Sequence, residues 1–557
     1  MRRDARGIEV ARGRGARAPL TRRVLVVLGL ALPATFAEPV VGQAPPPPAE
    51  APAASPAPTE PAKSGAQNAD AKAPAEPVEP EEKPPVPSSV FEEGVSAYKS
   101  GSEREAAKLL YTYLSGNDQT ADHYEWAEYY LAKTLERTGL SHAAVEYYYN
   151  VIREQKRPEL LPEALRAIEQ IVASRPLDKE LILVDLISSS EFGALPADVR
   201  AFVTYQQGRL DLAQGRPKWA ERHFDTLSRL ESASALARRY IQKSAFASAV
   251  NTLTETHDKS SIKKRETREA TIKTLEAIVA SDVDDFEIKN DARRTIARLH
   301  FEEGRYADAL KWYELIEVPF LSREEAALFV EKAWTRYYAG DHRGALGILL
   351  TLEAPSYRRF FSPERFVLKA LAYQGLCHYA AAKGAAREFL RRYGSTLEEL
   401  RRRRDPLADP VIRRAAASER EPKEVLAFLK RLQYEREQVE KLDEESGLRP
   451  HLVRIYDLKI AEVARKLDDV VRDAAERVSE ELLDYEEQAR LLDYEISLEV
   501  FRRIKKGTGK KIVDEEPPIP LGSKEVYYEF DGEYWNDELH DYRFRVENRC
   551  FGERLFQ

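Results

Sequence analysis

The sequence predicts an all-α protein whose centre is a solenoid of repeated helical hairpins. Two observations predict this fold. A glycine followed five residues later by an alanine recurs along the middle of the chain, and apolar residues recur every three or four positions in its C-terminal third. The 557 residues are too many for one ordinary core. A stacked array accommodates them because each repeat packs only against its neighbours.

The first 37 residues have the features of a secretory signal peptide. Eight arginines precede an apolar run from Val24 to about Phe36. This run is too short to cross a bilayer as a helix. Ala37 is a small residue before Glu38, where we expect cleavage. Because no cysteine follows the run, we expect a protein of the periplasm of a Gram-negative bacterium and not a lipoprotein. The alternative is a wrongly assigned start codon followed by a disordered basic tail.

Residues 38–88 are predicted to be a disordered linker rich in proline, alanine and glutamate. It includes Pro45-Pro46-Pro47-Pro48 and has too few apolar side chains to offset the entropy lost on folding. Polyproline stiffness would make it a spacer of about 100 Å, and a plain disordered leader is the alternative. Residues 1–37 hold eight arginines and two acids, so their removal changes the formal charge from −8 to −14. A nucleic-acid partner is therefore not expected.

Residues 89–394 carry the repeat. Its glycine–alanine pair occurs at Gly101/Ala106, Gly139/Ala144, Gly215/Ala220, Gly304/Ala309 and Gly340/Ala345, and Cys377/Ala382 continues the series. Successive pairs are 38, 76, 89, 36 and 37 residues apart, so two of the gaps have room for one further, degenerate repeat each. Weaker amphipathic stretches fill these gaps at 162–174, 178–190, 233–256 and 266–280, the last two separated by a charged loop at 259–265.

The copy around Gly304 is the clearest, and it reads from Ala297 to Ala309 followed by Trp312 and Tyr313. A small residue seven positions before the glycine lets two helices approach, and the glycine permits a tight turn between them. The pattern closely resembles the tetratricopeptide signature over about residues 90–394. This resemblance implies paired helices stacked into a curved array, whose first helices line a concave groove that binds other proteins.

The groove positions of the tetratricopeptide family can be carried over by counting back from each glycine. They combine aromatic rings with cations, which suits an extended peptide or helix with acidic and apolar side chains. The resemblance therefore predicts a partner-binding surface made of Trp126, Tyr129, Lys133, Phe202, Tyr205, Arg209, Arg294, Arg298, Trp334, Tyr337 and Tyr338. The alternative is that several of these side chains pack between the repeats.

Residues 395–506 are predicted to form long, coiled-coil-like helices at 422–445 and 450–506. In the second helix, apolar residues recur in steps of three and four from Tyr456 to Val500, with a stutter near Ala474. Three arrangements are consistent with this pattern: an antiparallel hairpin turning near Gly447, a homodimer, and docking onto the solenoid.

Residues 507–557 form an aromatic and acidic tail. The run from Tyr534 to Leu539, followed by Tyr542, resembles the tails of exported repeat proteins in gliding, predatory-type Gram-negative bacteria. Some of those proteins belong to envelope-spanning gliding-motility machines, so the resemblance implies a scaffold of an envelope complex. The alternative is a tail whose aromatic residues pack back on the last helices.

The sequence contains no motif that predicts catalysis, a metal or a cofactor. His-Glu-x-x-His and Gly-x-Ser-x-Gly do not occur, and Gly507-Thr508-Gly509-Lys510-Lys511 lacks the spacing and the hydroxyl residue of a phosphate loop. The two cysteines lie 173 positions apart and are not expected to pair. We expect Cys377 to be a small buried apolar residue, and a free thiol is one interpretation of Cys550 in its polar surroundings.

These observations together predict a non-enzymatic periplasmic scaffold that assembles a multiprotein cell-envelope complex through its repeats, of the gliding-motility type. The alternative is a client-binding chaperone, or a regulator of cell-wall enzymes, that acts through the same groove. Contact with a membrane is expected only through the signal peptide or through partners. Self-association through the long helices stays open.

Overall fold

The computed structural model describes residues 84–174, 192–255, 261–402, 404–442, 447–505, 532–534, 539–540, 542, 544 and 546–550. The predicted signal peptide, most of the predicted linker and the helix predicted at 178–190 lie outside these residues. Every regular element in the described part is a helix, which confirms the all-α prediction. Within those ranges, no helix has the length and apolar character needed to cross a membrane.

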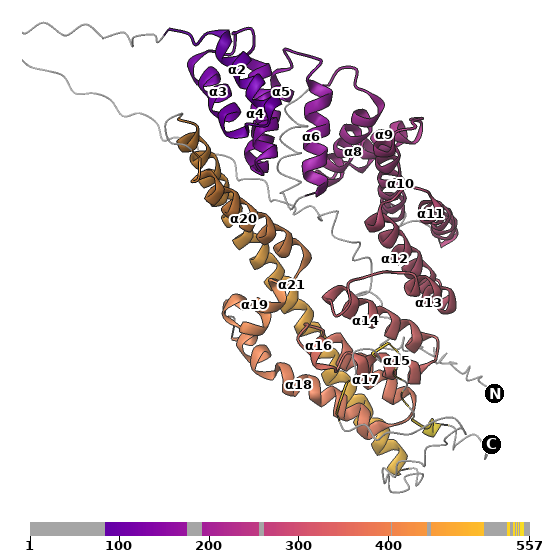
Figure 1. Ribbon diagram of the computed structural model, residues 1–557. Coiled ribbons are helices and arrows are strands. Elements are labelled where there is room, and N and C mark those ends of the chain that lie inside the picture. The colour runs from indigo at the N-terminus through magenta and orange to yellow at the C-terminus, as the bar shows by residue number, and fades with distance from the viewer. Residues whose placement is uncertain are drawn as a thin grey trace, which may run out of the picture.

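The repeats form pairs of helices that stack along a curve (Figure 1). The pairs are α2 (Ser88–Ser100) with α3 (Glu103–Gly116), α4 (Tyr124–Arg137) with α5 (Ser141–Glu154), α8 (Ala197–Ala213) with α9 (Pro217–Ser228), α12 (Phe286–Glu302) with α13 (Tyr306–Glu314), α14 (Arg323–Tyr338) with α15 (His342–Thr351), and α17 (Glu364–Gly375) with α18 (Tyr379–Arg401).

Helices α6 (Leu161–Ser174), α10 (Ala235–Glu255) and α11 (Ser261–Ala280) occupy the longer gaps, as the weak amphipathic patterns predicted, and the short α16 (Pro355–Arg358) precedes α17. Helix α11 begins at Ser261, inside the segment expected to be a charged loop. That expectation is wrong because lysine and arginine are good helix formers and need not interrupt a helix.

The glycine–alanine signature produces the predicted hairpins. The glycines Gly101, Gly139, Gly215, Gly304 and Gly340 each follow a first helix with φ between 67° and 83°. The alanines five residues later are fully buried: Ala106, Ala144, Ala220, Ala309, Ala345 and Ala382. The small residues seven positions before each turn are also buried: Gly94, Ala132, Gly208, Ala297, Ala333 and Ala370. Small side chains therefore stand where the paired helices approach most closely.

Cys377 takes the place of glycine in the last repeat. Its φ of 61° is left-handed, which costs about 1–2 kcal/mol for a residue with a Cβ. Its sulfur is bonded to that of Cys550, so the prediction that the cysteines do not pair is wrong. Separation along the sequence says little about pairing here, because the tail lies against the turn between α17 and α18.

The C-terminal third begins with a 3-10 turn (Pro406–Ala408) and α19 (Pro410–Ala416), followed by α20 (Arg420–Val439) and α21 (Leu448–Lys505). Helices α20 and α21 pack against each other as a hairpin. The 58 residues of α21 give it a length of about 87 Å. Of the three arrangements left open, the structure has two, because this hairpin also docks onto the solenoid.

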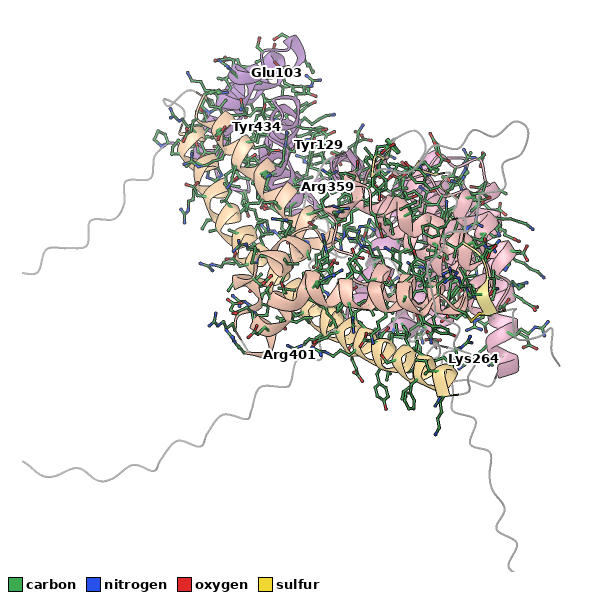
Figure 2. The ribbon with its side chains drawn as sticks, turned by 90° about the horizontal axis from the view of Figure 1, so that it is seen from below. Glu103, Tyr129, Lys264, Arg359, Arg401 and Tyr434 are labelled. Atoms are coloured by element: carbon green, nitrogen blue, oxygen red, sulfur yellow. A yellow bond between two sulfur atoms is a disulfide. The ribbon has the colours of Figure 1, made fainter. Side chains whose placement is uncertain are left out.

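Helix α21 belongs to both large apolar cores. Its part from Leu448 to Val470 packs with α20 and with the repeats nearest the start of the described chain. Its part from Ala474 to Ile496 packs with the last repeats. The change occurs at the predicted stutter, where Ala474 and Ala475 are both buried. Figure 1 shows the hairpin returning along the array, and Figure 2 shows its Tyr434 end beside the repeat that carries Tyr129.

The hairpin caps the N-terminus of α5. Leu140 stands at the N-cap and has no side-chain acceptor for the free N–H groups of the first turn. Glu435 of α20 supplies one: its Oε2 accepts hydrogen bonds from the His142 amide (3.0 Å) and from the Tyr456 hydroxyl (2.7 Å). The Tyr456 hydroxyl oxygen in turn accepts the Ala143 amide at 3.3 Å. A carboxylate at this end of a helix also interacts favourably with the helix dipole.

Arg431 completes this polar cluster, here called the node, which comprises Glu435, Tyr456, Arg431 and the first turn of α5. Arg431 forms an ion pair with Glu435 at 2.6 Å and donates a hydrogen bond to the Gly139 carbonyl at 2.9 Å. Glu435 and Tyr456 are fully buried. The neighbouring His142 ring lies 5.7 Å from the Tyr456 ring, and burial lowers its pKa to about 3, so it stays neutral near pH 7. The node therefore joins the α4–α5 turn to both helices of the hairpin.

The close approach of α8 to α9 can be tested at Gly208. A Cβ there would lie 2.5 Å from a carbon of the Phe224 ring, so Gly208→Ala should lower the free energy of unfolding by about 1–3 kcal/mol. Urea unfolding followed by circular dichroism measures this. The matched control is Gly384→Ala in α18, where nothing lies within 4 Å and alanine should stabilise by about 0.5–1 kcal/mol. Equal stability of the Gly208 variant and the parent would contradict the packing.

Candidate functional site

The predicted groove residues on α4 form an aromatic surface with one cation. The Trp126 ring stacks on Tyr130 with centroids 5.9 Å apart and meets Tyr129 edge-on at 6.2 Å. Lys133 donates a hydrogen bond to the Tyr129 hydroxyl at 3.3 Å, and its ammonium lies 5.2 Å from the centre of that ring. Tyr129 is mostly buried, whereas Trp126 and Lys133 are half-buried. The α4 surface, meaning Trp126, Tyr129 and Lys133, therefore presents parts of an indole and an ammonium group to solvent.

The predicted residues on α8 pack mainly against α10. The rings of Phe202 and Tyr205 lie 5.3 Å and 5.4 Å from the ring of Tyr240. Phe202 is only 1% exposed, so the expectation that it lies on an open groove is wrong. The physical reason is that α10 packs against α8 and covers it. Tyr205 and Arg209 are half-buried at the margin of this contact.

The predicted arginines on α12 pair with α14. Arg298 makes two hydrogen bonds to Glu331, at 2.9 Å and 3.3 Å, and Arg294 lies 4.0 Å from the same carboxylate. Burial alone would raise the pKa of Glu331, but Arg298 and Arg294 lower it on balance, so the carboxylate stays charged. A bidentate pair of this kind fixes the relative orientation of the guanidinium and carboxylate groups. These arginines hold adjacent first helices together, and their binding to a partner stays a prediction.

Trp334 on α14 is fully buried, so its predicted place on an exposed groove is wrong. Its Nε1 donates a hydrogen bond to Glu364 of α17 at 2.5 Å. Burial raises the pKa of Glu364 to about 7, opposed by hydrogen bonds from Trp334 and from Tyr485 of α21. The next repeat thus covers the indole, and Tyr485 of α21 reaches the same carboxyl group. Tyr337 and Tyr338, one turn further on, are half-buried.

The acidic and aromatic partners of the predicted groove residues were not predicted from the sequence. A usable signal was present, because the partners lie about one repeat apart. The separations are 33 residues for Arg298 and Glu331 and 30 for Trp334 and Glu364. Two pairs outside the predicted set have the same spacing, 32 residues for Arg166 and Asp198 and 34 for Arg268 and Glu302. Complementary side chains at the repeat spacing therefore indicate contacts between neighbouring hairpins.

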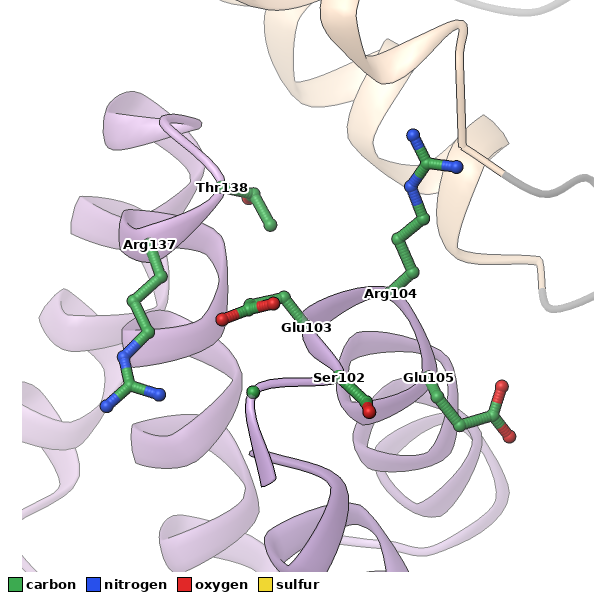
Figure 3. Close-up of a pocket in the computed structure, with 7 residues that line it drawn as sticks. Ser102, Glu103, Arg104, Glu105, Arg137 and Thr138 are labelled. Carbon is green, nitrogen blue, oxygen red and sulfur yellow. The ribbon is translucent and has the colours of Figure 1, made fainter. Parts of the chain in front are cut away.

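Two hollows lie on the surface of the described residues. One, of about 540 Å³, lies where the α2–α3 turn meets the end of α4 and is lined by Glu103, Arg104, Arg137 and neighbouring turn residues, most of them exposed (Figure 3). Another, of about 610 Å³, lies between α9, α10 and α11 and is lined mainly by hydroxyl and apolar side chains. The described ranges contain no group of three or more His, Cys, Asp or Glu side chains arranged to hold a metal.

The division of the predicted residues into buried and partly exposed ones can be tested with two tryptophan variants. Trp334→Ala should lower the free energy of unfolding by about 3–5 kcal/mol because it removes a buried indole and leaves Glu364 without that donor. Trp126→Ala should cost less, about 1–2 kcal/mol, because the ring is only partly buried. Chemical denaturation of both variants gives the comparison. A cost at Trp126 as large as that at Trp334 would show that the α4 surface belongs to the core.

Comparison with known proteins adds little to this account. A scan against protein-family models and a search of curated proteins each found no match. Among solved structures, the chain is similar to the crystal structure of the P58(IPK) TPR domain at 14% identity, covering 71% of this chain and 98% of that one. The TM-score is 0.17, too low to carry an argument. The assignment of a tetratricopeptide-like array therefore rests on the turns and buried alanines described above.

Proposed function

We propose that this chain is an exported interaction scaffold that holds protein partners in a cell-envelope complex of a Gram-negative bacterium. The observation that carries the proposal is the α4 surface on an array whose two ends are joined by one helix. Trp126 and Lys133 present an aromatic ring and a cation in a fixed orientation. A preorganised surface of this kind loses little conformational entropy when it binds.

The α4 surface suits a segment with an apolar or aromatic anchor and an acidic residue. Trp126 and Tyr129 offer flat apolar area, the kind of group that dominates protein interfaces. Burial would lower the pKa of Lys133, but the neighbouring Tyr129 raises it on balance, so the ammonium group stays charged and can pair with a carboxylate. The partner class is therefore a protein segment with both features.

Two features support export. The basic and apolar start of the sequence has the pattern of a signal peptide. Both cysteines of the chain are joined in one disulfide, and disulfides persist mainly in oxidising compartments such as the periplasm. The proposed gliding-motility type of the complex rests on the resemblance of residues 534–542 alone.

The packing of the predicted groove residues against neighbouring helices favours a scaffold over a client-binding chaperone. Promiscuous binders use adaptable surfaces that can repack around different clients. Here Arg298, Trp334 and Phe202 are instead committed to neighbouring helices. Fewer side chains are therefore left to adapt to varied clients.

Export can be tested by fractionating the native host and measuring the intact mass of the chain. The expected result is a periplasmic protein that begins at Glu38, since cleavage follows the small residue Ala37. Recovery of the chain in the cytosol with residues 1–37 retained would contradict the proposal.

Partner binding can be tested by crosslinking mass spectrometry on the same cells. The double variant Trp126→Ala with Lys133→Ala should lose the crosslinks that other lysines of the first repeats, Lys108 and Lys156, make to a small, fixed set of envelope proteins. The matched control is Trp219→Ala with Arg222→Ala on α9, where an exposed tryptophan also meets a cation, at 4.6 Å, on a different surface. Unchanged crosslinks in the α4 variant would contradict the scaffold proposal, and a broad set of unrelated clients would favour the chaperone.

A further inference from the structure

The described residues between 532 and 550, here called the tail, lie against the last repeats. At one end, Leu539 is fully buried, and its carbonyl oxygen accepts a hydrogen bond from the Thr351 hydroxyl of α15 at 2.5 Å. His540 follows, with its Nε2 3.4 Å from a carboxylate oxygen of Glu325 and its ring 5.2 Å from that of Phe329, both on α14. This end of the tail is anchored by main chain and side chains alike.

At the other end, the tail meets α17 and the turn after it. The Phe544 ring lies 5.9 Å from the ring of Tyr373 and, with Val546, packs on a small apolar cluster. The Arg549 amide donates to the Leu376 carbonyl at 3.1 Å, and the Glu547 carbonyl lies 2.7 Å from the His378 ring nitrogen. The disulfide to Cys377 closes this end.

The contact pattern of the tail is that of an extended peptide ligand. Besides Leu539 and Tyr534, its apolar contacts come from Tyr542, Phe544 and Val546, which occupy every second position of the sequence. Alternate side chains of an extended segment point to the same side. Main-chain groups at residues 539, 547 and 549 supply hydrogen bonds. Recognition by alternate side chains together with the main chain is a general mode of peptide binding.

The surface beneath the tail is apolar. The tail face, formed by Phe329 and Tyr337 of α14, Leu346 of α15, and Tyr373 and Leu376 of the α17 region, is covered in part by tail residues. Apolar area of this kind on an isolated array would mark an interaction site. Its edge carries Glu325, which faces His540.

We propose that the tail face is a second binding surface, for an extended segment with apolar residues at alternate positions and a basic residue opposite Glu325. The tail of the chain is its resident ligand, and the Cys377–Cys550 disulfide holds it in place. This proposal rests on the interaction role proposed above, but it concerns a different surface from that of α4. The external ligand is a protein segment of the same chemistry as the tail.

The disulfide makes the resident ligand hard to displace. A tethered segment competes at a high effective concentration, so a free peptide binds only when the tether is cut or the tail is weakened. Cutting it requires an external dithiol, whose thiolate attacks one sulfur of the disulfide. Two electrons and two protons pass to the protein, leaving two cysteine thiols, and the dithiol becomes a disulfide. Cys377 stands where the other turns have glycine, which places the tether at the end of the tail face.

A labelled peptide of residues 532–550 carrying Cys550→Ser is the probe, and fluorescence anisotropy measures its binding to the full chain. One receptor is the oxidised parent protein. The other is the full chain with Phe544→Ala, Val546→Ala and Cys550→Ser, whose own tail lacks both its tether and its apolar contacts. Circular dichroism checks that both receptors are equally helical.

The variant receptor should bind the probe with a micromolar dissociation constant. The dissociation constant of the oxidised parent should be larger by a factor of roughly ten or more. A probe carrying Phe544→Ala and Val546→Ala should lose the binding. Adding Trp126→Ala and Lys133→Ala to the variant receptor should leave it unchanged, which separates this surface from α4. No binding by the variant receptor, or equal binding by the oxidised parent, would overturn the proposal.

A second measurement tests whether the Cys377–Cys550 disulfide by itself holds the tail in place. Cys377→Gly removes the disulfide and restores the residue that the other turns use, so the turn itself should not be weakened. Trypsin should cleave the tail of this variant faster than that of the oxidised parent by roughly ten-fold, and reduction of the parent should give the same increase. Equal cleavage rates in all three samples would show that the disulfide does not hold the tail.

Discussion

The arrangement of this protein depends on one buried carboxylate. Glu435 accepts hydrogen bonds from the first turn of α5 and from Tyr456, both out of contact with water, and it pairs with the partly exposed Arg431. Removing one partner of a buried charged pair typically costs about 3–5 kcal/mol, because the remaining groups stay unsatisfied. The node therefore fixes the hairpin on the first described repeats with a definite register.

The long helix transmits this constraint to the other end of the array. Since α21 continues without interruption from the first core into the second, the two ends of the solenoid are held at a distance set by one rigid element. Solenoids whose repeats touch only their neighbours can bend as the small rotations between repeats add up. Here α21 limits that bending, which suits a protein that holds partners at fixed positions relative to one another.

The sequence predicted the local parts of this fold well. The turn glycines, the buried alanines and the apolar stripe of α21 follow from backbone conformation and from helical periodicity, both of which act over a few residues. Even the stutter at Ala474 marked the change from one core to the other. The α4 surface was also located from the repeat register, although its role as a binding site stays a prediction.

What the sequence did not predict were contacts between distant segments. Phe202 and Trp334 have the residue types of a binding surface, but α10 covers Phe202 and α17 covers Trp334. The pairing of Cys377 with Cys550 depends on where the tail lies, which no local pattern encodes. The departure from glycine at Cys377 was visible, yet its meaning required knowing that the turn is left-handed and that a tether reaches it.

Hydrogen exchange of α21 in a Glu435→Ala variant tests the central claim most directly. If the node docks the hairpin, protection of residues 448–470 should fall about 100-fold, matching a loss of about 3 kcal/mol, while residues 474–496 keep theirs. Arg436→Ala, which removes an exposed pair with Asp457, should change protection in either half by less than about three-fold. Unchanged protection of residues 448–470 in the Glu435 variant would contradict the account.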